Sequence, residues 1–363
     1  MKIRFAKPLI DQSDIDAVAQ SLKQRTLTNG GNVMQFEERF VEYIGGGIAV
    51  AVSSCTAALY MAMKCLDIGA GDEVIVPALS FAACAHVVEA VGAVPVFVDV
   101  RPETGVIDPA LAEAAIGPKT KAIMAMHYVG KPCDLSILKD ICRRRNIFLV
   151  EDCATALGAL HSNIHVGLHG DIGCFSFHAV KHVTCGEGGM LVTRHPEIAE
   201  RARKLRQFGI EHNVYDQLPG EYDVIQFGLN FRMTEMQAAL GLGQLAKANT
   251  RLSVRERNWR AVQSAIDFAT VLDTAGAFYA LIVMLPDGLD QHTVRIELSK
   301  QYIETSIYYP GPLPHTSYYR RLFVDFPAAE KIAKQSIALS CGPHLTLDHM
   351  AYQVDTLRDI LCA

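Results

Sequence analysis

The chain has 363 residues, of which 50% are hydrophobic and 20% are charged, and its formal net charge is −5. This length is enough for one large domain and a smaller one around a substantial buried core. The acidic balance, without a basic tail or a known nucleic-acid signature, argues against nucleic acid or a membrane surface as a partner.

Short apolar runs alternate with amphipathic stretches between about residues 47 and 150. The apolar runs predict buried strands at 48–52, 73–76, 94–98, 121–126 and 147–150. The stretches between them predict helices at 56–65, 81–91, 109–115 and 135–145. Such alternation builds a mostly parallel sheet that is covered by helices.

The pattern changes in the second half of the chain. Residues 171–193 predict two strands on either side of a glycine-rich link, and helical patterns return at 195–207 and 234–265. Further strands are expected at 278–284 and 308–309, and further helices near 292–302 and 327–335. We therefore assign residues 1–250 to a large α/β domain and residues 251–363 to a smaller α+β domain.

The ten cysteines form no Cys-x-x-Cys pair, and the thirteen histidines show no metal-ligand spacing. We expect reduced, mostly structural thiols and no bound metal. The N-terminal segment lacks an apolar signal core, and the most apolar run, 278–285, is too short to span a bilayer. These features predict a soluble cytoplasmic protein.

The segment Ser53-Ser54-Cys55-Thr56 lies where the first predicted strand ends and a helix begins. Free backbone N–H groups and the helix dipole make such a turn an anion site, and the hydroxyl groups add donors. The alternative interpretation is an ordinary helix N-cap, because Ser and Thr favour that position in any case.

An acidic pair, Glu151-Asp152, ends the strand predicted at 147–150. In an open α/β sheet, the carboxyl ends of the strands are where ligands bind. A carboxylate at this place could keep a pyridine nitrogen protonated, which makes pyridoxal phosphate (PLP) an electron sink. A helix-capping aspartate is the alternative interpretation.

Lys181 stands just beyond a predicted strand, beside His178 and His182 and before a Gly-Glu-Gly-Gly turn at 186–189. A desolvated lysine becomes a neutral, nucleophilic amine that can form a Schiff base. The alternative is a surface lysine in a β-turn. A dinucleotide-binding glycine motif and a P-loop are both absent from the sequence, so a dinucleotide oxidoreductase has no positive support.

Together these motifs resemble those of the DegT/DnrJ/EryC1/StrS sugar aminotransferases, which have the fold type I architecture of PLP enzymes. The resemblance covers nearly the whole chain and keeps the family's order. Its markers are residues 27–31, 54–59, 71–77, 151–152, 176–189 and 228–233.

The resemblance implies a role for each matching residue. Lys181 matches the Schiff-base lysine, and Asp152 matches the carboxylate that faces the pyridine nitrogen. The residues implied at the cofactor are Ser54, Cys55, Thr56, Phe81, Asp152, Thr155, Ser176, Lys181 and Asn230. Among these, Phe81 is expected to stack on the cofactor ring, and Asn230 to reach the phosphate in the neighbouring subunit of a homodimer. The residues implied near the sugar are Gly30, His178, Tyr309 and His315.

Three features depart from the family pattern. Cys55 stands where the family usually has glycine, and Thr155 replaces a common glutamine or histidine. The segment 81–85 is less polar than the usual threonine-containing version. None of these changes removes an essential group.

The resemblance thus predicts a PLP-dependent aminotransferase that passes an amino group from an amino acid, with L-glutamate as the expected donor, to a keto-sugar. The sugar is expected to be nucleotide-linked, in amino-sugar, surface-polysaccharide or secondary-metabolite biosynthesis. Loops near 178–186, 208–228 and 309–320 should set the specificity, with 209–220 as a substrate loop. The alternatives are a PLP-dependent dehydratase or lyase, a non-catalytic PLP-fold binding protein, and a structural dimerisation protein.

Overall fold

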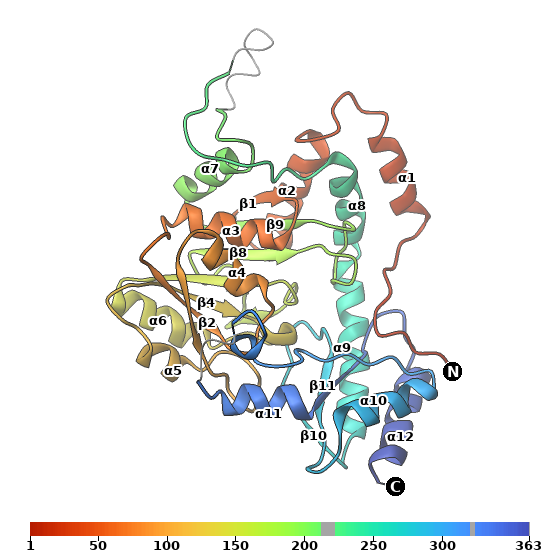
Figure 1. Ribbon diagram of the computed structural model, residues 1–363. Helices are drawn as coiled ribbons and strands as arrows, with labels where there is room; N and C mark the ends of the chain where they lie inside the picture. The colour runs from red at the N-terminus through yellow and green to blue at the C-terminus, as the bar shows by residue number, and fades with distance from the viewer. Residues whose placement is uncertain (212–221, 320–323, 363) are drawn as a thin grey trace.

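A seven-stranded sheet forms the centre of the computed structural model, which describes residues 1–211, 222–319 and 324–362 (Figure 1). The strand order is β1-β9-β8-β5-β4-β2-β3, and among these seven strands β9 alone runs antiparallel to both of its neighbours. The mostly parallel α/β sheet predicted from the sequence is therefore confirmed. The strands are β1 (Ile48–Val52), β2 (Glu73–Pro77), β3 (Val94–Val98), β4 (Thr120–Met126), β5 (Phe148–Asp152), β8 (Ile172–Ser176) and β9 (Gly189–Thr193).

Helices pack on this sheet: α2 on β1, α3 on β8 and β9, and α6 on β4 and β5. Strands covered in this way are apolar at nearly every position, which is why they read as continuous apolar runs in the sequence. A short hairpin of β6 (Leu160–His161) and β7 (Ile164–His165) follows β5. The helices of this region are α1 (Gln12–Ser21), α2 (Gly31–Ile44), α3 (Cys55–Cys65), α4 (Ala83–Ala90), α5 (Pro109–Ala114), α6 (Leu135–Arg145), α7 (Pro196–Leu205) and α8 (Glu235–Ala246), with a 3₁₀ turn η1 (Tyr128–Gly130).

A second hydrophobic core surrounds the buried Trp259 in the C-terminal part of the chain. Its sheet is antiparallel, with β10 (Thr270–Val271), β11 (Leu281–Met284) and β12 (Ser336–Leu339) in that order. Its helices are α9 (Ala248–Ala265), α10 (Gln291–Lys300), α11 (Pro327–Gln335) and α12 (Leu347–Leu361), and η3 (Leu313–His315) is a 3₁₀ turn. Ile3 also belongs to this core, and both termini lie on this side of the molecule (Figure 1). The domain boundary at residue 250 stays a prediction.

Two predicted elements of the C-terminal half are wrong. The single helix expected at 234–265 is two helices, because α8 ends at Ala246, where the N–H of Lys247 bonds to the carbonyl of Gln244. The strand expected at 308–309 is a bend, because the carbonyl of Tyr308 accepts a hydrogen bond from the hydroxyl of Tyr128 instead of a neighbouring strand.

Three further findings concern the predictions on loops, thiols and membranes. Most of the expected substrate loop 209–220 lies outside the described residues. All ten cysteines are free thiols, and nine of them are buried. In the described part of the chain, no helix has the length and apolar character needed to cross a membrane.

Candidate active site

A cavity of about 390 Å³ opens where α3 begins and where β5 and β8 end. This is the carboxyl edge of parallel strands, the place where α/β sheets bind ligands. The cavity brings together ten of the thirteen residues named from the sequence: Ser54, Cys55, Thr56, Phe81, Asp152, Thr155, Ser176, His178, Lys181 and Tyr309.

The start of α3 forms one end of the cavity. The side chain of Ser54 is the N-cap, since its Oγ accepts a hydrogen bond from the N–H of Ala57 at 3.1 Å. The first N–H groups of the helix, at Cys55 and Thr56, have no acceptor within the helix, so this end can hold an anion. Gly189 makes the arrangement possible, because a Cβ there would lie 2.4 Å from the carbonyl carbon of Ser54.

Lys181 lies in the turn after β8, and its half-buried side chain lines the cavity. Its Nζ lies 5.2 Å from the centre of the Tyr279 ring. Burial lowers the pKa of Lys181 below its ordinary value, although the nearby charge of Asp152 opposes this effect. The amine is therefore deprotonated more easily than an exposed lysine, as a nucleophile or general base requires.

Asp152 is the last residue of β5, and its side chain is buried. Its Oδ1 accepts a hydrogen bond from the N–H of Ala154 at 2.9 Å, and its Oδ2 accepts one from the thiol of Cys84 at 3.1 Å. Thr155 directly follows Ala154, and its hydroxyl donates a hydrogen bond to the carbonyl of His127 at 3.0 Å. That hydrogen therefore points to the backbone and not into the cavity.

Glu151 lies next to Asp152 but points the other way, because successive side chains alternate across a strand. It is fully buried. Its carboxylate accepts hydrogen bonds at 2.7–3.1 Å from Nε2 of His127 and from the N–H groups of Gly167, His169 and Gly170. Burial alone would raise the pKa of Glu151, but the hydrogen bonds and the His127 ring outweigh it, so this pKa lies below its usual value.

The His127 ring is also fully buried, and both of its nitrogens are engaged. Its Nδ1 accepts a hydrogen bond from the N–H of Cys133 at 3.1 Å. The ring proton is therefore on Nε2, which donates a hydrogen bond to Glu151. One possible ligand atom each from His127, Glu151 and Cys153 lies within 4.8 Å of the other two, which is close enough to hold a metal ion. Hydrogen bonds within the protein already satisfy the imidazole and the carboxylate. We therefore interpret these residues as a buried hydrogen-bond network that stabilises the end of β5.

The mouth of the cavity is lined by exposed side chains. Phe81 is 59% exposed, and its ring centre lies 6.1 Å from that of Tyr309. Nε2 of His178 lies 3.8 Å from a carboxylate oxygen of Glu187. Glu187, Tyr279 and Tyr308 also line the cavity, and none of them was predicted as a site residue from the sequence. A signal existed only for Glu187, which lies inside the glycine-rich turn.

Three residues named from the sequence lie outside the cavity. The N–H of Gly30 donates to Glu235 at 2.7 Å. Asn230 is exposed to solvent, and its Oδ1 accepts a hydrogen bond from the N–H of Arg232. The imidazole of His315 lies 2.8 Å from the carbonyl of Val324 and therefore turns away from the cavity.

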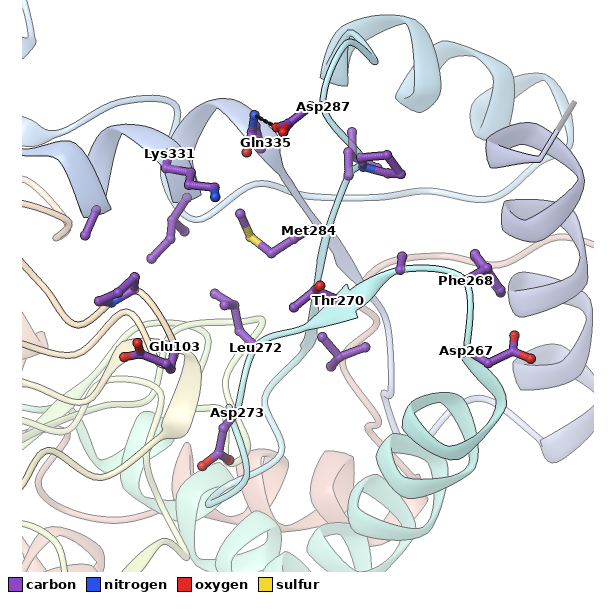
Figure 2. A pocket seen from close by; sticks show the side chains of 17 residues that line it. Glu103, Asp267, Phe268, Thr270, Leu272, Asp273, Met284, Asp287, Lys331 and Gln335 are labelled. Atoms are coloured by element: carbon purple, nitrogen blue, oxygen red, sulfur yellow. Dashed lines mark hydrogen bonds between the residues drawn. The ribbon is translucent and has the colours of Figure 1, made fainter.

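A larger cavity of about 870 Å³ lies between α11, β10 and β11 (Figure 2). Two of its acidic side chains have charged partners: Asp273 pairs with Lys131, and Asp267 pairs with Arg358. Asp287 accepts a hydrogen bond from Gln335, drawn as the dashed line in Figure 2. Lys331 lines the larger cavity, but the carboxylates that line it, as far as the chain is described, are all exposed, so it offers no buried carboxylate of the kind that lies near Lys181 in the smaller cavity.

The smaller cavity fits PLP in chemistry and in size. It offers a helix N-terminus for a phosphate, a buried carboxylate for a pyridinium, and a lysine amine of lowered pKa for an aldehyde. Its volume falls within the range of about 300–1,000 Å³ that is usual for small-ligand sites.

Comparisons with known proteins agree with this geometry. Residues 8–358 match the model of the DegT/DnrJ/EryC1/StrS aminotransferase family. The chain is 32% identical to the spore coat polysaccharide biosynthesis protein SpsC of Bacillus subtilis, over 98% of this chain and 96% of that protein. It is similar in structure to Helicobacter pylori PseC, an aminotransferase in the biosynthesis of pseudoaminic acid, with a TM-score of 0.94, 27% identity and 99% of both chains covered. It also resembles Streptococcus pneumoniae Spr1654, assigned as a sugar aminotransferase and solved in its PLP form, with a TM-score of 0.93, 28% identity, and 99% of this chain and 98% of that chain covered. The chain therefore belongs to the DegT/DnrJ/EryC1/StrS aminotransferase family and is a PLP-dependent sugar aminotransferase.

Proposed function

We propose that this aminotransferase takes its amino group from L-glutamate and passes it to the ketone of a nucleotide-linked sugar, with Lys181 and Asp152 as the catalytic residues. The observation that carries the proposal is that a lysine of lowered pKa and a buried carboxylate line one cavity beside a helix N-terminus. Each of these groups meets a different requirement of the chemistry.

The start of α3 and the end of β8 bind the phosphate group in this proposal. The N–H groups of Cys55 and Thr56 and the hydroxyl of Ser176 are the donors. A helix N-terminus favours a phosphate because unpaired N–H groups and the helix dipole act together. These donors would anchor the cofactor at one end of the cavity that Lys181 also lines.

Asp152 is the residue that would face the pyridine nitrogen of the cofactor. When bound, PLP supplies an electron sink for the electrons of the broken C–H bond, and protonation of its ring nitrogen strengthens that sink. Lys181 is the residue that would move the proton: its Nζ would take the proton from the α-carbon of the amino acid as a base and would give it up again as an acid. An amine of lowered pKa suits both steps, because at a given pH its neutral form is more populated than that of an exposed lysine.

Two copies of the chain are proposed to share their active sites. Exposed apolar side chains precede Asn230 in the sequence, namely Tyr222, Val224, Ile225, Phe227 and Leu229. Contiguous exposed apolar residues mark protein interfaces. A second copy seated on this segment would bury these residues and bring Asn230 to the phosphate end of its partner's cavity.

The nucleotide-linked substrate is inferred from the relatives. SpsC is named for polysaccharide biosynthesis, and DesI, a structural neighbour at 29% identity and a TM-score of 0.90, was solved in the presence of its TDP-sugar product. We therefore propose a keto-sugar on a nucleotide carrier as the substrate class of this enzyme. The exposed mouth of the cavity leaves room for a carrier group.

The test follows nitrogen into the product. The purified enzyme is incubated with ¹⁵N-labelled L-glutamate and a panel of nucleotide-linked keto-sugars, and the sugar products are analysed by mass spectrometry. We expect one labelled amine in the sugar, and loss of turnover in Lys181→Ala. Lys131→Ala is the matched control, because Lys131 pairs with Asp273 outside the cavity and should be fully active.

Other outcomes would decide for the alternatives. A sugar that loses water and gains no nitrogen would identify a dehydratase. Absence of any change in cofactor absorbance with L-glutamate or L-glutamine would point to a binding protein. Substantial turnover in Lys181→Ala would refute the role of the lysine.

A further inference from the structure

Cys84 contacts the carboxylate of Asp152. It lies in the first turn of α4, and its Sγ is 3.1 Å from Oδ2 of Asp152. Both side chains are buried, with Cys84 completely inaccessible. Its neighbour Ala83 lines the cavity, whereas Cys84 is not among the lining residues of the described chain. The thiol therefore reaches the carboxylate from the protein core.

The proton of this hydrogen bond belongs to sulfur. Burial raises the pKa of Cys84 well above its ordinary value, and the charge of Asp152 raises it further. The thiol therefore stays protonated and donates S–H to Oδ2. Since Ala154 donates its N–H to Oδ1 at 2.9 Å, both oxygens of the carboxylate are held by protein donors.

The chemistry of sulfur makes this contact different from that of a hydroxyl group. A thiol is a weak hydrogen-bond donor, whereas a hydroxyl donates strongly to a carboxylate. A strong donor draws negative charge away from the oxygen that it contacts. A weak donor orients the same oxygen and leaves it more basic.

We propose that Cys84 is a positioning residue that orients Asp152 through a weak S–H donor and so leaves the carboxylate its negative charge for the pyridine nitrogen. This inference rests on the proposed role of Asp152. It predicts that the strength of the donor at position 84 changes the protonation of the bound cofactor.

The other buried cysteines that the structure describes near Asp152 do not form the hydrogen bond that Cys84 forms. Cys174 is equally buried and near enough for the charge of Asp152 to raise its pKa, yet it forms no hydrogen bond with the carboxylate among the described residues. The thiol of Cys153 instead faces the carbonyl of Glu151 at 3.9 Å. Cys174 therefore offers a matched control.

Other titratable groups lie near enough to Asp152 for its charge to shift their pKa values, and a pH experiment must take them into account. They are Cys55 on α3, Cys133 before α6, Cys153 after β5, Cys174 on β8, Lys181 and Tyr309. Burial raises the pKa of each thiol and of Tyr309, so these groups stay neutral near neutral pH. Lys181 is the same in every variant below, so differences between variants report on position 84.

The first experiment titrates the absorbance of the bound cofactor against pH in the wild type, Cys84→Ser, Cys84→Ala and Cys174→Ala. The hydroxyl of Cys84→Ser should lower the apparent pKa of the pyridine nitrogen by roughly half a unit to one unit. Cys84→Ala removes a donor and should raise this pKa. Cys174→Ala should leave it unchanged.

Opposite shifts in the serine and alanine variants would support the proposal, because a residue that only fills space gives no such reversal. Equal shifts in one direction, or none, would overturn it. The labelled-nitrogen assay distinguishes this failure from failure of the proposed function: transfer would persist while the titration stayed unchanged.

A second measurement needs no cofactor and no folded serine variant. The infrared S–H stretching band of Cys84 is identified in the cofactor-free protein as the band missing from Cys84→Ala. In Asp152→Asn this band should move toward the position of a weakly bonded thiol, because a charged acceptor is replaced by a neutral one. A band that stays unchanged in Asp152→Asn would overturn the proposal.

Discussion

The floor and the mouth of the active-site cavity are built in different ways. The floor comprises the carboxylate of Asp152, which lines the cavity, and that of Glu151 on the opposite face of β5; both are buried, and every one of their oxygens accepts a hydrogen bond. At the mouth, the side chains of His178 and Glu187 are 46% and 64% exposed, with 3.8 Å between ring nitrogen and carboxylate. A saturated buried network fixes its members, whereas an exposed ion pair is weak and rearranges easily. The floor thus suits a fixed cofactor, and the mouth suits recognition of a variable substrate.

The largest effect is expected from Asp152→Asn at the floor. The amide keeps the shape of the side chain but removes the negative charge that would stabilise a protonated pyridine nitrogen. We expect the rate of the half-reaction with L-glutamate to fall by roughly 10²–10³-fold, the usual cost of removing a preorganised electrostatic group. Stopped-flow absorbance of the bound cofactor measures this rate. A fall smaller than about tenfold would contradict the assignment of Asp152.

Glu151→Gln tests whether the floor depends on its second carboxylate. Glutamine would turn an amide NH₂ toward some of the N–H donors that now bond to Glu151, leaving buried groups unpaired. We expect a loss of about 3 kcal/mol in the free energy of unfolding, as for other broken buried charge networks. Urea unfolding of the cofactor-free protein measures it.

Glu187→Gln is the matched control at the mouth. The change removes an exposed charge, so the free energy of unfolding should stay within about 0.5 kcal/mol of the wild type. Equal losses in both variants would mean that the floor and the mouth do not differ in rigidity.

His165, beneath the floor, predicts how stability responds to acid. Burial lowers the pKa of His165 to about 4, so it stays neutral in the fold, whereas in the unfolded chain it titrates near 6.5. Between these values the unfolded state binds the extra proton, so the free energy of unfolding falls as the pH drops. The slope for one such histidine approaches about 1.4 kcal/mol per pH unit. Urea unfolding between pH 7 and pH 4 should show a shallower slope in His165→Gln, and an unchanged slope would contradict the prediction.

The parts of the site that depend on local order were predicted from the sequence. Ser54 and Asp152 lie at strand ends and Lys181 lies in the turn after β8, so the apolar runs placed all three at the same edge of the sheet. Glu151 was paired with Asp152 without a role of its own, although alternation along a strand would have turned it to the opposite face.

The features that the sequence did not predict depend on contacts between distant segments. Tyr279 and Tyr308 come from the C-terminal part of the chain and reach the cavity by packing with the main core, and position 308 was expected in a strand. The break between α8 and α9 lies at Lys247, which pairs with Asp11 and Asp14 of the N-terminal segment at 2.6 and 3.0 Å. No local pattern near residue 247 contains these partners.

The smallest effect is expected from His178→Gln at the mouth. Because the ring is exposed and its partner Glu187 is 3.8 Å away, the pair adds little to stability, and its loss should leave the fold and cofactor binding intact. If His178 contacts the substrate, its removal should raise KM for the keto-sugar by roughly 2- to 10-fold, with kcat within a factor of about two, because binding alone is weakened. Steady-state kinetics with the accepted sugar separate these constants. A fall in kcat of more than 100-fold at unchanged KM would place His178 in the chemistry, and the division between a catalytic floor and a recognising mouth would then be wrong.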